Sequence, residues 1–225
     1  MKFYTADTHF NHAGVIDMSK RPFRSVHQMN EAMITRWNER VTDKDEVYFL
    51  GDFSFKALDA AREIFVRLAG QKHLIVGNHD KSGIHDWSWV SINQTQMVHD
   101  GDERIFLSHY PVLEWPGYYR GVRHFFGHVH GNKTVPGATD VGVDLWDYRP
   151  VTAKEAIAGM TPLEPDEKKV TMADFGGEAT RQILKRADDW MAPWERSVLA
   201  DALDRAANQA LEDILNQRID QAGCW

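Results

Sequence analysis

Leu74-Ile-Val-Gly-Asn-His-Asp80 is the stretch of sequence that decides the fold. Its three apolar residues stop at Gly77, and an amide, an imidazole and a carboxylate follow at once. A buried strand ends in this way when it delivers polar groups to the rim of a sheet. The stretch therefore predicts a strand with functional side chains at its carboxyl end.

Four other apolar runs end in the same manner. Parallel strands present their carboxyl ends at one edge of a sheet, so five such endings predict that metal-ligand chemistry converges there. The four endings and their runs are Asp7-Thr-His9 after 2–6, Gly51-Asp52 after 47–50, Ser108-His109 after 105–107, and Gly127-His-Val-His130 after 124–126.

The composition bounds the class of protein. The 225 residues are 43% hydrophobic and 26% charged, as in soluble globular proteins. No apolar run approaches the roughly 20 residues that span a bilayer, and the first residues enter a strand directly instead of a signal peptide, so we expect a cytoplasmic protein without a membrane partner. The only cysteine is Cys224, which leaves histidine and carboxylate to carry any metal.

The charge is acidic and unevenly distributed. The net charge is −7, and from Thr161 onward there are 13 acidic and 8 basic side chains. A long basic groove for nucleic acid is therefore not indicated.

The first half of the chain has a β-α-β-α-β pattern. A loop over 11–24 leads to a capping box at Ser25 and Gln28, which begins a helix through about Arg40. A strand over 46–50, a helix over 57–68 closed by Gly70, and the strand over 74–76 follow, which implies parallel strands with right-handed crossovers. The expected core positions of the two helices are Met29, Met33, Ile34, Trp37, Leu58, Ala61, Ile64, Phe65 and Leu68.

Extended segments dominate the next part of the chain. Segments 87–99 and 103–109 are joined by Asp100-Gly-Asp102, a hairpin signal, and further strands are expected over 123–126 and 141–145. Residues 142–144 are interpreted as a core strand and its turn. Thr152 and Glu155 cap a short helix through about Ala158. The pattern predicts an α/β domain with a second, antiparallel-rich layer.

The chain beyond Met160 is expected to be a linker and a helical extension. Residues 161–169 carry two prolines among charges, and a long amphipathic helix is expected over about 194–221. We therefore divide the chain into a domain over 1–160 and an extension over 161–225. The helix either packs on the domain or forms a homo-oligomer or partner contact.

The polar residues at the strand ends form a mixed set of metal ligands. Such imidazoles, carboxylates and an amide oxygen suit Mn, which we favour, or Fe, Zn or Ni, better than Mg or Ca. Seven ligands exceed one tetrahedral ion but fit two divalent ions that share a carboxylate at about 3.5–4 Å separation. The candidates are Asp7, His9, Asp52, Asn78, His109, His128 and His130.

These stretches resemble, in order, the five motifs of the calcineurin-like metallophosphoesterases: D-x-H, G-D, G-N-H-[DE], H and G-H-x-H. The resemblance covers residues 1–160 and implies a four-layer α/β/β/α sandwich that hydrolyses phosphate esters. It also implies that Asp52 bridges two ions, one bound by Asp7, His9 and His130 and the other bound by Asn78, His109 and His128.

The resemblance also implies a mechanism. His79 matches the family's catalytic histidine, which protonates the leaving oxygen or steadies the phosphoryl charge while a metal-bridging hydroxide attacks phosphorus. Asp80 is placed in the sequence to orient His79.

Departures from the family pattern indicate which class of substrate to expect. The second motif reads Gly51-Asp-Phe-Ser-Phe-Lys56 where protein phosphatases resemble G-D-x-V-D-R-G, and the third ends in Asp80 instead of glutamate. The chain looks more like small bacterial and phage phosphoesterases. We expect a phosphodiesterase acting on nucleotide-like or small diesters; the alternatives are a phosphomonoesterase, a catalytically silent scaffold and a nuclease.

Four loop residues are candidate substrate contacts. An arginine near two metals can clamp a phosphate, which makes Arg21, Arg120 and Arg123 candidates. His12 lies three residues beyond His9 and either touches substrate or stabilises its loop.

Overall fold

The computed structural model describes residues 1–55 and 58–162, which belong to one compact unit, Met1–Leu163. The long C-terminal helix and nearly all of the expected linker lie outside the described residues, so the division of the chain at residue 160 stays a prediction. Among the described residues, no helix is both long and apolar enough to cross a lipid bilayer.

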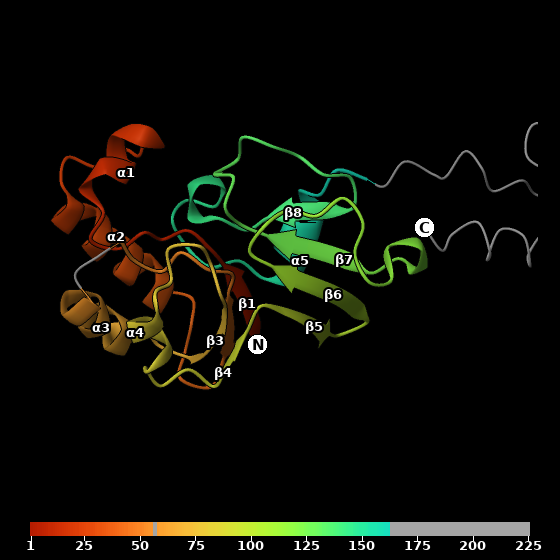
Figure 1. Cartoon of the computed structure of the whole chain (residues 1–225), viewed down its shortest axis with the longest axis horizontal. Helices are drawn as coiled ribbons and strands as arrows, with labels where there is room; N and C mark the ends of the chain where they lie inside the picture. Colours follow the sequence, from red (N-terminus) through yellow and green to blue (C-terminus); the bar gives the residue numbers. More distant parts are fainter. Residues whose placement is uncertain (56–57, 163–225) are drawn as a thin grey trace, which may run out of the picture. The chain divides into compact units, whose positions relative to one another are not determined.

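The first sheet is wholly parallel and confirms the predicted β-α-β-α-β pattern (Figure 1). Its strands are β1 (Lys2–Thr5), β2 (Glu46–Phe49), β3 (Gln71–Ile75) and β4 (Ser91–Asn93), in that spatial order. Helices α2 (Val26–Asn38) and α3 (Leu58–Arg67) are the crossovers. Two short helices, α1 (Ala13–Met18) and α4 (Ser82–His85), complete this half, and α1 corrects the prediction that 11–24 is only a loop.

The amphipathic faces of the two crossover helices pack on this sheet. The Ser25 hydroxyl accepts a hydrogen bond from the Gln28 N–H at 3.1 Å and caps α2, but the Gln28 side chain accepts from the Arg24 N–H instead of the Ser25 N–H, so only half of the predicted capping box forms. Leu58 is 38% exposed, so its predicted core position is wrong. The other predicted core residues are buried: Met29, Met33, Ile34, Trp37, Ala61, Ile64, Phe65 and Leu68.

The second sheet contains β5 (Thr95–Asp100), β6 (Glu103–Ser108), β7 (Arg123–Phe126) and β8 (Ala138–Asp140), in that order. Strands β5 and β6 form the predicted hairpin, and Gly101 at its tip has φ +59°. Strands β7 and β8 are added in parallel, so the layer is not antiparallel-rich. The expected single segment over 87–99 is also wrong, because β4 joins the first sheet and β5 the second.

The strand expected over 141–145 is wrong as well. Strand β8 ends at Asp140, and Val143–Leu145 form the 3₁₀ helix η2. The Asp140 carboxylate accepts the Gly142 N–H at 2.7 Å, and the Val143 N–H donates to the carbonyl of Ala6 at 3.0 Å. These bonds turn the backbone out of the second sheet and towards the first strand of the other sheet.

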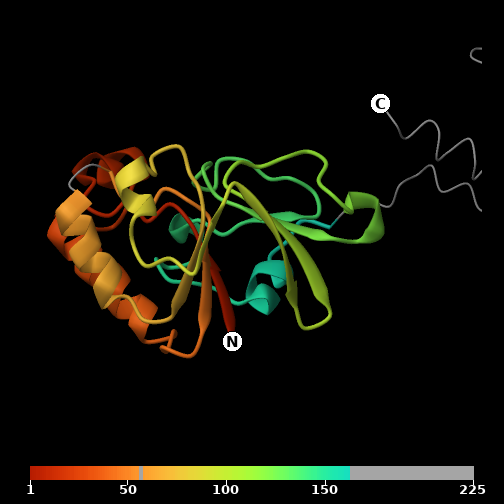
Figure 2. The same cartoon turned by 60° about the horizontal axis from the view of Figure 1, so that its bottom comes forward.

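The two sheets pack face to face as an α/β sandwich (Figures 1 and 2). Helices α2 and α3 cover the outer face of the first sheet, and apolar residues of both sheets fill the space between them. Helix α5 (Ala153–Ala158), which begins with the predicted Thr152–Glu155 capping box, lies beside β1 and β8. The outer face of the second sheet packs against Trp115 and Val122, which flank the 3₁₀ helix η1 (Tyr118–Arg120).

His124, in β7, is fully buried in that outer cluster, where its Nδ1 donates to the Phe106 carbonyl at 3.1 Å and its Nε2 accepts the Val112 N–H. Burial lowers the pKa of His124 to about 4, against the hydrogen bond to Phe106, which raises it. Because the unfolded chain takes up this proton first, acidification from pH 6.5 towards 4 should cost the fold about 3 kcal/mol through His124 alone.

Denaturant unfolding at a series of pH values checks this expectation. His124→Asn should lower the loss of stability between pH 6.5 and 4 by the share due to His124, about 3 kcal/mol, whereas the same change at the exposed His27 should leave it intact. An unchanged slope in His124→Asn would show that His124 is not the group responsible.

Candidate metal centre

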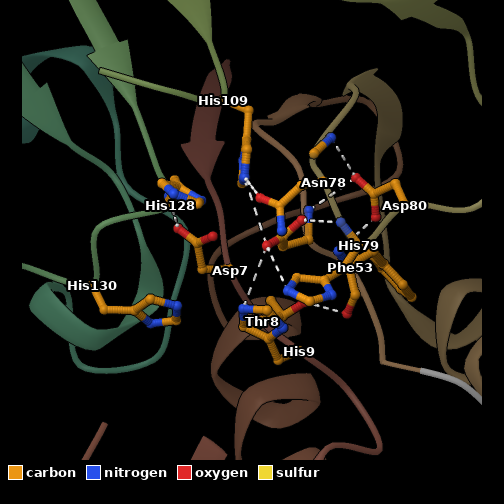
Figure 3. Close-up of polar contacts among 12 residues, drawn as sticks. Asp7, Thr8, His9, Phe53, Asn78, His79, Asp80, His109, His128 and His130 are labelled. Carbon is orange, nitrogen blue, oxygen red and sulfur yellow. Dashed lines mark hydrogen bonds and ion pairs between the residues drawn. The ribbon is translucent and has the colours of Figure 1, made fainter. Parts of the chain in front are cut away.

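The predicted ligands meet at one edge of the sandwich, as five strand ends require (Figure 3). Asp7 and His9 follow β1, Asp52 follows β2 and Asn78 follows β3. The second sheet contributes the remaining three: His109 follows β6, and His128 and His130 follow β7.

The ligands gather in two groups. Within each group the candidate ligand atoms lie within 4.8 Å of one another. The amide oxygen of Asn78 lies 2.9 Å from Nε2 of His109 and so joins the second group. The first group is Asp7, His9 and His130, and the second is Asp52, His109 and His128.

One oxygen of Asp52 lies between the two groups. Its Oδ2 is 3.7 Å from Nε2 of His9 and 3.6 Å from Nε2 of His109. Two ligand atoms on one ion are typically about 3–3.5 Å apart, because each metal–ligand bond is about 2.0–2.2 Å long. Asp52 Oδ2 is therefore within reach of an ion in either group.

The turns that carry the ligands have unusual backbone conformations. Asp7, His9, Asp52, His128 and His130 all have φ between +48° and +71°, in the left-handed region that non-glycine residues seldom adopt. Such strain gathers at functional sites, where the surrounding structure holds it in place. Here the Asp7 N–H donates to the carbonyl of Gly51 and the His9 N–H to that of Asp52.

Two motif glycines let these turns approach closely. A Cβ on Gly77 would overlap Asp52 Oδ1, and a Cβ on Gly127 would lie 2.5 Å from Asp7 Oδ2. Both positions therefore require glycine because a carboxylate of a neighbouring motif fills the space.

The hydrogen bonds of His109 prepare it to bind a cation. Its Nδ1 is 2.7 Å from the carbonyl oxygen of Leu50, which only accepts, so Nδ1 carries the hydrogen and Nε2 is bare in the neutral ring. Nε2 then faces another acceptor, the Asn78 amide oxygen, at 2.9 Å. Two acceptors that converge at this distance fit a cation held between them.

The first group also shows the signs of a cation site. Within the part of the chain that the structure describes, Asp7 Oδ1 and His9 Nδ1 are buried without a hydrogen-bond partner. Burial, together with the charges of Asp140 and Asp52, raises the pKa of Asp7 well above its ordinary value. Burial, followed by the charges of His130 and Arg21, lowers the pKa of His9 to about 2, so this ring is neutral and able to ligate. The residues fit a bound metal, which would neutralise the Asp7 carboxylate and take its unpaired oxygen, while Nε2 of His9, 3.7 Å from Asp52 Oδ2, would ligate.

His79 lies beside the shared carboxylate and remains accessible. Its Nε2 is 4.0 Å from Asp52 Oδ2, and its side chain is 37% exposed. Its backbone N–H donates to Asp52 Oδ1 at 2.8 Å, which fixes the position of the residue.

The Asp80 carboxylate bonds to backbone N–H groups and not to the His79 ring, which corrects the expectation that Asp80 orients His79. The two oxygens accept the backbone N–H groups of Gly77, Asp52 and Phe53 at 2.8–2.9 Å. Asp80 therefore holds the turn that presents Asp52.

The structure separates the four predicted substrate contacts. His12 lies close to the centre, with its ring 5.7 Å from that of His9 and stacked on Phe55 at 4.1 Å. Arg120 is exposed on η1, and Arg123 begins β7 at the end opposite His128 and lies 3.5 Å from a Glu103 oxygen. The expected phosphate contacts of these two arginines are not supported by their positions.

The predicted phosphate contact of Arg21 is wrong, because its side chain is fully buried and pairs with Asp144. A phosphate cannot reach a guanidinium that is enclosed and already bonded in this way.

Sequence reasoning missed three neighbours of the centre. Asp144 accepts a hydrogen bond from His130 Nδ1 at 2.6 Å, and Asp140 accepts the Gly131 N–H just after His130. Tyr110, next to His109, places its ring 4.5 Å from that of His128. Tyr110 could have been found because it directly follows His109, whereas Asp144 lies in the stretch 142–144, which is interpreted from the sequence as a strand and its turn, and Asp140 precedes that stretch without any motif to mark it.

Relatives of the chain have been found by sequence, although no protein-family model matches it. An uncharacterized protein of Methanocaldococcus jannaschii, MJ1445, is 33% identical over 159 residues, covering 67% of this chain and 85% of its own length. The gene 66 protein of Mycobacterium phage D29 is 27% identical over 181 residues, covering 64% of this chain and 88% of its own.

One solved structure shares the fold, and a second is more distantly similar. A protein of unknown function from Aquifex aeolicus, AQ665, aligns with a TM-score of 0.59 and 24% identity, over 70% of this chain and 98% of its own. The phosphoesterase YfcE from E. coli aligns with a TM-score of 0.37 and 15% identity, over 63% and 77%. The chain belongs to the same family as MJ1445, and its five ordered motifs at the strand ends of two packed sheets, with their ligands in two groups, give it the fold and motif order of the calcineurin-like metallophosphoesterases.

Proposed function

We propose that this protein is a phosphoesterase that uses two divalent metal ions and prefers phosphodiesters. The observation that carries the proposal is the position of Asp52 Oδ2 within 3.7 Å of a ligand nitrogen in each of two groups. A carboxylate shared in this way is the geometry of two-metal phosphoryl chemistry.

The residues assigned to the ions follow the two groups. Asp7, His9 and His130 would hold the first ion, and His109, His128 and the oxygen of Asn78 the second, with Asp52 between them. The nitrogen and oxygen donors suit Mn, which we favour, or Fe, Zn or Ni. When bound, such ions stabilise the charge on the phosphoryl oxygens and lower the pKa of a coordinated water.

His79 supplies a proton at the same place. Its accessible Nε2 stands 4.0 Å from Asp52 Oδ2, and its backbone is tied to the other oxygen of that carboxylate. Where the ester is bound at the centre, a histidine in this position can protonate the leaving oxygen.

The surroundings of the centre support a diester preference. Tyr110 is 49% exposed and packs on His128, while Phe55 packs edge-on against His79 with ring centroids 5.4 Å apart. Two aromatic side chains beside different parts of the centre can contact the two organic groups of a diester. A dianionic monoester would benefit from an arginine clamp, and Arg21, Arg120 and Arg123 do not provide one.

We favour small nucleotide-like diesters as substrates. Planar bases suit exposed aromatic side chains. The net charge of −7 is unfavourable for binding long nucleic acids through their phosphate backbone. We therefore do not favour a nuclease that acts on polymers.

A substrate comparison on metal-stripped protein reloaded with Mn, Ni, Zn or Fe tests the proposal. Bis-nitrophenyl phosphate and cyclic nucleotides should be hydrolysed only by reloaded protein, with a kcat/KM at least about 10-fold above that for nitrophenyl phosphate. A higher kcat/KM for the monoester would show a phosphomonoesterase. Two bound metals without turnover of any ester would show a scaffold.

A further inference from the structure

A buried ion pair lies behind the first ligand group. The guanidinium of Arg21 donates from Nε and Nη2 to the two oxygens of Asp144, at 2.7 and 2.9 Å. The two residues are 123 positions apart, and their side chains are 0% and 9% exposed. Burying such a pair carries a desolvation cost, so it contributes little to net stability on its own.

The carboxylate of this pair fixes the ring of His130. Oδ2 of Asp144, which accepts from Arg21, also lies 2.6 Å from Nδ1 of His130. A carboxylate flanked by a guanidinium is ionised and only accepts, so Nδ1 carries the hydrogen and Nε2 of the neutral ring is bare. Figure 3 shows the His130 ring directed towards Asp7 and His9, on the side of the centre opposite Asn78.

The guanidinium also holds the turn that carries the other two ligands of this group. Nη2 donates to the carbonyl oxygen of Asp7 at 2.7 Å, and Nη1 donates to that of Thr8 at 2.8 Å. Asp7 and His9 both have left-handed backbones, which need such support. One guanidinium thus links the D-x-H turn to His130, more than 100 residues away.

The second group is held by other contacts. His109 is oriented by the carbonyl of Leu50, and the His128 N–H donates to Asp7 Oδ2. The two groups are therefore supported differently, because the hydrogen bonds of Arg21 and Asp144 reach only the first group.

We propose that Arg21 and Asp144 are a positioning pair that sets the ring tautomer and orientation of His130 and thereby the affinity of the first ion alone. The inference rests on the proposed two-metal function, but it assigns to this pair a role that the family motifs do not include. Partners of ligating histidines typically contribute about 10- to 100-fold to metal affinity.

The test compares Asp144→Asn with Glu155→Gln in a calorimetric Mn²⁺ titration of metal-stripped protein. Glu155 is a matched control, because it also pairs with one arginine, Arg40, at 2.8 Å, and no strand-end ligand is among its partners. In Asp144→Asn the affinity of one site should fall about 10- to 100-fold while the other changes less than about threefold. Glu155→Gln should leave both affinities unchanged. Equal weakening of both sites, or of neither, would overturn the proposal.

Nitrogen-15 NMR of the histidine rings in metal-free protein gives a readout that does not depend on metal. In the wild type, His130 should be the Nδ1–H tautomer, and Asp144→Asn should shift its ring resonances, whereas Glu155→Gln should not. An Nε2–H tautomer in the wild type would refute the assignment even if Asp144→Asn failed to fold. A wild type that shows the expected tautomer but takes up no metal would contradict the proposed function and not the orientation of His130.

Discussion

Replacing Asp52 with asparagine should lower phosphodiesterase activity about 1,000-fold or more and remove at least one of two bound metal ions. Its Oδ2 lies 3.7 Å from Nε2 of His9 in the first group and 3.6 Å from Nε2 of His109 in the second. An amide of the same shape keeps the packing but loses the negative charge that offsets two cations, and losing several kcal/mol of such stabilisation corresponds to this factor.

The Asp52→Asn result is checked by elemental analysis after dialysis together with turnover of bis-nitrophenyl phosphate. Asp147→Asn is the control, since that side chain is 68% exposed and pairs only at the surface with Arg36. Two retained equivalents of metal with near-normal turnover would show that Asp52 does not bridge the ions.

The second large effect is expected for His79→Asn, which should leave both metals bound while slowing hydrolysis. General acid catalysis typically contributes about 10²–10⁴-fold, and it matters most when the leaving oxygen is basic. A nitrophenolate needs little protonation, whereas the alkoxide of a ribose or alkyl ester needs much. The variant should therefore lose more rate on nucleotide or alkyl diesters than on nitrophenyl diesters.

Rates on a series of leaving groups, with metal content measured alongside, separate the roles of His79. Equal losses across the series would favour electrostatic stabilisation of the phosphoryl group over proton donation. Loss of metal would make His79 a ligand, although its Nε2 is farther from Asp52 Oδ2 than the nitrogens of His9 and His109 are.

Much of the fold could be predicted because its signals are local. The strand ends, the cap of α2 and the capping box of α5 depend on neighbours a few residues apart, such as Ser25 with Gln28 and Thr152 with Glu155. The division of 87–99 between two sheets could not be predicted, because alternation shows that a segment is extended but not which strand it pairs with.

For the site, too, the local features could be predicted from the sequence and the long-range contacts could not. His109 and Asp52 follow apolar runs that mark them, so the sequence could predict where they gather. The contacts that hold the ligands in place are made between residues far apart in the sequence, as with Arg21 and Asp144. No sequence spacing predicts such contacts. For that reason a buried arginine was interpreted as a phosphate clamp and Asp80 as a partner of His79.

Anomalous diffraction from crystals of the protein soaked in Mn²⁺ would show directly whether the centre holds two metal ions. Two peaks are expected, about 3.5–4 Å apart, on either side of Asp52 Oδ2. One peak should lie among Asp7, His9 and His130, and the other among Asn78, His109 and His128. A single peak at these ligands, or ordered manganese elsewhere with none between the two groups, would contradict a two-metal centre.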